Sequence, residues 1–204
     1  MKNNGKNVKN KLYRLTLTAI FSALVIVFQL ISYTVKVGPF GLTVTLVPVV
    51  LGAALLGRRG GAFLGGVFGA VVTACSIYGL DSGGQILFGV NPFLTILTCM
   101  VKGIAAGLVA GLIFAALSNK NKTAAAVCAA AAAPVVNTSL FLAAMLLFFK
   151  DTLASWAGGT DLLTYILTGL VGINFIFEFS LNLLLSPLIL AVLRALSKSG
   201  NNYE

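Results

Sequence analysis

Long apolar runs, separated by short polar segments, dominate the chain. Glycine, proline and charged residues divide it into six apolar segments, at 15–33, 42–57, 60–78, 88–117, 124–149 and 163–196. A helix needs roughly 20 apolar residues to cross a bilayer. The pattern therefore predicts an all-α integral membrane protein, a bundle of six transmembrane helices over 15–196 with polar tails at 1–14 and 197–204. The second segment is short, so we expect it to be tilted, bent or partly extended.

Composition supports a membrane protein and argues against a nucleic-acid-binding one. Hydrophobic residues make up 58% of the chain and charged residues only 9%, whereas a soluble domain carries about 25% charged residues. The formal net charge is +9. The basic residues gather at the ends of the apolar segments rather than along one surface, which is typical of contact with lipid headgroups.

The distribution of basic residues predicts the orientation. They precede the first segment, lie between the second and third and between the fourth and fifth, and follow the sixth: Lys2, Lys6, Lys9, Lys11, Arg14, Arg58, Arg59, Lys120, Lys122, Arg194 and Lys198. The alternate connections contain Lys36 and Lys150 together with Asp81, Asp151 and Asp161. Cytoplasmic loops are rich in Lys and Arg, so both tails are predicted to be cytoplasmic in a multi-pass protein of the cell membrane. An even number of spans requires the same arrangement.

Small residues recur at four-residue spacing in three of the segments. Two such stripes are Gly61, Gly65 and Gly69, and Gly103, Gly107 and Gly111. Small residues four apart let helix backbones approach closely in lipid, and we interpret both stripes as packing within the bundle. Ala19 and Ala23, in "AIFSA", form a third stripe that is unremarkable by periodicity alone.

One apolar segment carries a polar stripe. In "INFIFEFSLNLL" (173–184), Asn174, Glu178 and Asn182 stand four apart, so they share one face of a helix. A carboxylate at that depth costs about 2.5 kcal/mol or more on insertion scales. The stripe must therefore face the bundle interior or a watery cavity.

Two other segments supply possible partners for this stripe. Lys102 lies in the fourth, which is broken at Asn91–Pro92, and Asn137 lies in the fifth, just after Pro134. Polar groups and broken helices at membrane depth are typical of transporter binding sites. The residues leave two interpretations open. In one, Lys102 and Glu178 form a structural ion pair; in the other, these groups line a pocket for a hydrophilic solute.

The sequence argues against an enzyme and against a bound metal or cofactor. It contains no histidine, no H-E-x-x-H, no G-x-S-x-G and no Walker-type phosphate loop. Glu178 is the one acid inside an apolar segment, and a lone carboxylate is no complete catalytic constellation. Cys75, Cys99 and Cys128 show no metal spacing. If transport is driven by ATP, the ATPase must be another chain.

The chain resembles the substrate-binding S components of prokaryotic energy-coupling factor (ECF) vitamin transporters, over nearly its whole length. The basic tail, six short spans and "AIFSA" stripe are similar to that family. "VPVVLGAALLGRRGGAFLGGVFGAV" (47–71) looks like its second and third helices, and "GINFIFEFSLNLLLSPLI" (172–189) is similar to the sixth helix of riboflavin- and pantothenate-type members.

This resemblance implies a function and specific residues. An S component captures a water-soluble vitamin or precursor outside the cell and delivers it inward with a membrane-embedded T component and two ABC-type ATPases. The alanine stripe, Ala19 and Ala23, would dock on the T component. The solute would be bound by Asn91, Lys102, Asn137, Asn174, Glu178 and Asn182. Gly38, Pro39 and Trp156 would contribute to an outer lid.

Two alternatives from other classes stay open on sequence alone. The first is a stand-alone secondary transporter, in which Glu178 would carry a proton. The second is a structural membrane subunit without a solute of its own.

Overall fold

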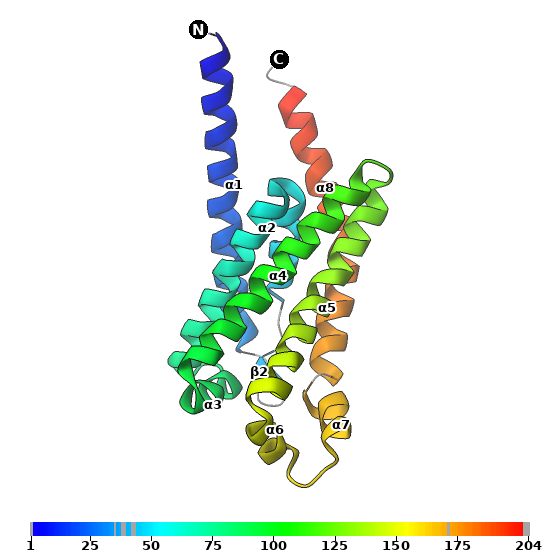
Figure 1. Ribbon diagram of the computed structural model, residues 1–204. Coiled ribbons are helices and arrows are strands. Elements are labelled where there is room, and N and C mark those ends of the chain that lie inside the picture. Colours follow the sequence, from blue (N-terminus) through cyan, green and yellow to red (C-terminus); the bar gives the residue numbers. More distant parts are fainter. Residues whose placement is uncertain (1, 35, 38–39, 42–43, 171, 202–204) are drawn as a thin grey trace.

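The protein is an elongated bundle of helices (Figure 1). The computed structural model describes residues 2–34, 36–37, 40–41, 44–170 and 172–201. Its elements, in chain order, are α1 (Lys2–Ser32), β1 (Lys36–Val37), β2 (Phe40–Gly41), α2 (Leu46–Ile77), α3 (Ser82–Val90), α4 (Pro92–Ser118), α5 (Lys122–Phe148), α6 (Lys150–Ala157), α7 (Leu162–Tyr165), the π-helix η1 (Ile166–Leu170) and α8 (Gly172–Asn201). The start of α1 and the end of α8 lie at one end of the bundle, and α3, α6 and α7 lie at the other (Figure 1).

The all-helical membrane architecture predicted from the apolar runs is confirmed. Within the described ranges, five helical segments are long and apolar enough to cross a bilayer: Lys11–Ser32, Leu46–Ile77, Pro92–Ser118, Lys122–Phe148 and Asn174–Val192. The strands are two residues each and form a small antiparallel pair after α1. The basic segment predicted as a tail is helical from Lys2 onward and continues directly into the first span.

The second and third predicted segments are the two arms of α2, which folds back on itself at Gly57. Gly57 has φ +79° and ψ −177°, a conformation that glycine adopts without strain. Beyond the bend the arms pack together, since a Cβ on Gly61 would lie 2.7 Å from the Cβ of Ala53. Arg14 of α1 donates a hydrogen bond of 2.8 Å to the carbonyl oxygen of Leu56. This bond ties α1 to the end of the first arm.

The remaining boundaries follow local capping signals. The break at Asn91–Pro92 separates α3 from α4, and the Asn91 side chain accepts a hydrogen bond from the Leu94 amide at 3.1 Å. The sixth predicted segment is divided into α7, η1 and α8. The polar connection at 150–161 contains the short helix α6, which the sequence analysis did not predict.

The predicted role of the glycine stripes in packing within the bundle is confirmed, and the structure shows that the two stripes pack against each other. A Cβ on Gly65 would overlap the carbonyl oxygen of Gly103, and a Cβ on Gly61 would overlap that of Gly107. The second arm of α2 and α4 are therefore in backbone contact, the geometry that small residues permit in membranes.

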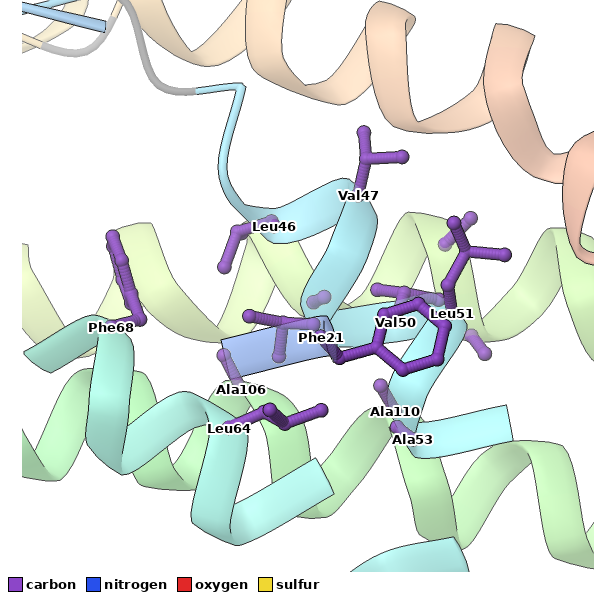
Figure 2. Close-up of a cluster of buried hydrophobic side chains, with 14 of the residues drawn as sticks. Phe21, Leu46, Val47, Val50, Leu51, Ala53, Leu64, Phe68, Ala106 and Ala110 are labelled. Carbon is purple, nitrogen blue, oxygen red and sulfur yellow. The ribbon is translucent and has the colours of Figure 1, made fainter. Parts of the chain in front are cut away.

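An apolar core surrounds this contact. Figure 2 shows Phe21 of α1, side chains from both arms of α2, and Ala106 and Ala110 of α4 converging at its centre. Alanines of α5 and Ile189 of α8 complete the core.

We expect Gly65→Ala to destabilise the bundle. The new methyl group would meet a backbone carbonyl of α4 that cannot turn aside, and forced separation of packed helices costs about 1–3 kcal/mol. Gly66→Ala is the matched control, because its Cβ would lie 3.5 Å from the flexible side chain of Ile104. Thermal unfolding in detergent measures both variants. Equal stability of the two would contradict the proposed backbone contact.

Candidate functional site

A polar cavity lies in the half of the bundle that carries α3, α6 and α7. It is bordered by α1, the second arm of α2, α3, α4, α5, η1 and α8. Its polar lining consists of Gln29, Tyr33, Ser76, Asp81, Thr95, Thr98, Cys99, Lys102, Asn137, Thr138, Asn174 and Glu178. Its apolar lining is Phe68, Val72, Gly84, Leu87, Phe141, Met145, Phe149, Leu170 and Phe175. The aromatic and aliphatic walls with a few convergent polar groups are typical of a small-molecule site.

Four of the six predicted solute-binding residues meet in this cavity. Lys102 comes from α4, Asn137 from α5, and Asn174 and Glu178 from successive turns of α8. The polar stripe of α8 therefore faces the bundle interior where it borders the cavity. Asn137 and Glu178 are both buried.

Two buried acceptor atoms in the cavity wall have no hydrogen-bond partner among the described residues. They are Oδ1 of Asn137 and Oε1 of Glu178. Leaving a buried acceptor unsatisfied costs about 1–3 kcal/mol, and each such group in a native structure requires an explanation. A solute with hydrogen-bond donors would supply the missing partners.

Lys102 does not form the structural ion pair that the sequence left open. Among the described residues, no ion pair within 4.0 Å joins its ammonium to Glu178. The ammonium instead lies 5.1 Å from the ring centroid of Phe141 and 5.9 Å from that of Phe68. Both distances fall within the range of cation–π attraction.

The other two predicted residues take part in local structure and do not line the cavity. Asn91 caps α4. Asn182 is buried, and its side-chain nitrogen donates a hydrogen bond of 2.9 Å to the backbone oxygen of Glu178. That bond lies within α8 and helps to hold the turn that carries Glu178.

A second apolar cluster, from α3, α5, α6 and η1, borders the cavity. It consists of Leu87, Met145, Phe149, Leu153, Ile166 and Leu170, and the predicted lid residue Trp156 packs against it from α6. Four of these six residues also line the cavity. The other two predicted lid positions, Gly38 and Pro39, lie outside the described residues.

Sequence reasoning missed a polar group at the cavity wall. The Tyr33 hydroxyl donates to Oδ2 of Asp81 at 3.4 Å, and Oδ1 of Asp81 accepts the Gly84 amide at 3.2 Å. Burial, and secondarily the negative charge of Asp81, raise the pKa of Tyr33 and keep its hydroxyl a donor. The signal was available, because an aspartate directly before an apolar stretch is a common helix N-cap.

Comparison with known proteins identifies the family. A family model described as "ECF transporter, substrate-specific component" matches residues 13–190. The chain is also 30% identical over 210 residues to the "Pantothenic acid transporter PanT" of Lactococcus lactis subsp. cremoris (strain MG1363), an alignment that covers 95% of this chain and 98% of that protein. The chain belongs to the ECF substrate-specific component family.

Membership in this family indicates the general function of the protein. The protein is a vitamin-binding subunit of a transporter and a multi-pass protein of the bacterial plasma membrane. The family is a class of transporter components rather than of enzymes.

We expect Glu178→Gln to cost little stability. Breaking a close buried ion pair would cost about 3–5 kcal/mol, but no such pair joins Glu178 to Lys102 among the described residues. The loss of stability, measured by thermal unfolding, should therefore stay well below that range. The Lys102→Met, Glu178→Gln double variant should recover nothing relative to Glu178→Gln. Strong recovery in the double variant would show that the two residues form a scaffold.

Proposed function

We propose that this chain is the substrate-binding subunit of an ECF-type ABC importer that captures a pantothenate-like vitamin or precursor from outside. It would deliver the solute inward together with a T component and two ABC-type ATPases. The main support is the cavity itself, in which buried Asn137 and Glu178 present acceptor atoms that have no hydrogen-bond partner among the described residues. A structural subunit without a solute has no use for such groups at membrane depth.

The choice of a pantothenate-like over a riboflavin-like solute rests on two supports. The Lactococcus relative is a pantothenic acid transporter. Pantothenate is small and carries hydroxyl and amide donors, which suit the acceptors of Asn137 and Glu178. Asn174, beside them on α8, also lines the cavity. Asn91 and Asn182 would support the site through α4 and α8 rather than by contact.

The proposed orientation has six membrane crossings with both termini in the cytoplasm. The two arms of α2 would count as separate crossings, and the first of them, from Leu46 to the bend at Gly57, would be short. The start of α1 and the end of α8 lie at one end of the bundle (Figure 1). The α2 bend, with Arg58 and Arg59, and the α4–α5 turn, with Lys120, lie toward the same end (Figure 1). The positive-inside rule makes that end cytoplasmic.

The proposed docking surface for the T component is the alanine stripe of α1. Ala19 and Ala23 are both exposed on the outside of the bundle, so they are not needed for packing within this chain. Small exposed residues four apart allow a second helix to approach closely in lipid.

Two substitutions should separate docking from solute binding. In proteoliposomes containing the T component and ATPases, Ala19→Leu should abolish ATP-driven uptake of pantothenate and leave its binding to the purified subunit unchanged. Glu178→Gln should weaken both, with binding falling by about 10- to 100-fold, the worth of a charged hydrogen bond. Calorimetry measures the affinity of the purified subunit for pantothenate and for riboflavin. Uptake into the proteoliposomes is measured with labelled solute.

The uptake assay also tests the competing functions. Uptake by the purified chain alone in a pH gradient would contradict the importer and indicate a proton-coupled secondary transporter. Binding of neither vitamin, at full stability, would favour a subunit without a solute. Loss of binding in Ala19→Leu would show that the stripe belongs to the fold.

Cysteine labelling tests the orientation. In a background lacking Cys75, Cys99 and Cys128, we expect Ser155→Cys to react with an impermeant maleimide from outside and Arg59→Cys only after the membrane is opened. Both positions are exposed in the structure, so a missing reaction reports sidedness rather than burial. The reverse pattern would overturn the proposed topology.

A further inference from the structure

Lys102 is the single cation among the described residues that line the cavity. Its ammonium has three N–H donors. Among the residues that the structure describes, no hydrogen bond or ion pair reaches it. Thr95, Thr98 and Cys99 line the same wall, but the two threonine hydroxyls are engaged with backbone oxygens of the preceding turn.

Two aromatic rings hold this ammonium in place without satisfying it. Phe68 of α2 and Phe141 of α5 lie on the neighbouring walls, at 5.9 Å and 5.1 Å from Nζ. Ring faces attract a cation, but they are poor substitutes for the oxygen acceptors that an ammonium binds in water. The position of Phe68 follows from the glycine contact, because its ring lies 3.1 Å from the Cβ position of Gly103, next to Lys102.

The cavity wall presents both hydrogen-bond acceptors and hydrogen-bond donors that need partners. Within the part of the chain that the structure describes, Oδ1 of Asn137 and Oε1 of Glu178 are acceptors without donors, and Lys102 supplies donors without an acceptor. A solute that satisfies all three carries an anionic oxygen group at one point and hydroxyl or amide donors at others. A neutral solute that carries only hydrogen-bond donors would leave the Lys102 ammonium without an acceptor.

We infer that Lys102 binds the carboxylate of the solute and sets the preference of the cavity for an anionic over a neutral ligand. The inference rests on the proposed function and adds the chemical class of the solute and the residue that selects it. Phe68 and Phe141 act as positioning residues, which keep the ammonium away from Glu178 and directed at the incoming carboxylate. A charge-assisted contact of this kind contributes about 10- to 100-fold in affinity.

The test compares pantothenate with panthenol, its neutral analogue, in which an alcohol replaces the carboxylate. The wild-type subunit should bind pantothenate about 10-fold or more tightly than panthenol by calorimetry. Lys102→Met should remove that preference. It should weaken the binding of pantothenate and leave the affinity for panthenol within about threefold of the wild-type value. Phe141→Leu should reduce the preference in part, because the ammonium loses one ring. Lys120→Met is the matched control, since Lys120 is exposed in the turn between α4 and α5.

Each outcome decides the assignment. Equal affinity of wild type for the two compounds overturns it, and this measurement does not depend on whether Lys102→Met folds. Equal weakening of both compounds by Lys102→Met also overturns it, while leaving the proposed vitamin-binding function in place. Binding of neither compound by the folded wild-type protein overturns the pantothenate-like solute and this inference together. Loss of the preference in Lys102→Met but not in Lys120→Met supports it.

Discussion

The backbone contact between the second arm of α2 and α4 is the constraint on which the rest of the structure depends. Helices in a membrane gain no hydrophobic free energy by associating, so their packing rests on close van der Waals contact. Gly61 and Gly65 meet Gly107 and Gly103 at distances where any side chain would overlap a carbonyl oxygen. This contact sets both the separation and the register of the two helices. The core of α1, α2, α4 and α5 then assembles around it.

The register of that contact also determines the chemistry of the cavity. Gly103 follows Lys102 directly, and the ring of Phe68 packs against Gly103 from α2. The same approach that joins the backbones therefore brings an aromatic face to the Lys102 ammonium. Farther along α2, Val72 and Ser76 continue as cavity wall. The packing motif and the binding site are thus successive stretches of one helix interface, and a shift in one would displace the other.

The sequence predicted the membrane spans and part of the site for reasons that are local in the chain. Apolar runs, glycine spacing and the i, i+4 stripe of α8 are each visible within about 20 residues, so the apolar segments and the inward direction of Asn174 and Glu178 could be predicted. The predicted count was six spans, whereas the described residues contain five candidate spanning helices, because the second and third predicted segments are the two arms of α2. The hairpin at Gly57 was predicted as a boundary between two spans, but the contact between its arms is tertiary. The two rings around Lys102 come from α2 and α5, and no spacing links them. Asp81 was missed because an acid in a polar connection ordinarily faces water, whereas here it is buried and accepts hydrogen bonds from the Tyr33 hydroxyl and the Gly84 amide.

A cavity with unsatisfied groups persists only where the surrounding structure is rigid enough to prevent collapse. The acceptor atoms of Asn137 and Glu178, which have no partner among the described residues, would each be stabilised by about 1–3 kcal/mol on meeting a donor. Lys102 would also be stabilised by moving to Glu178. The glycine contact on one side and the aromatic rings on the other oppose such movement. The apolar cluster of α3, α5, α6 and η1 borders the cavity beside these groups, and an apolar surrounding strengthens the polar contacts inside. A solute that supplies both an anionic acceptor and donors would satisfy all three groups at once, so the groups whose burial is costly are the same groups that would select the solute.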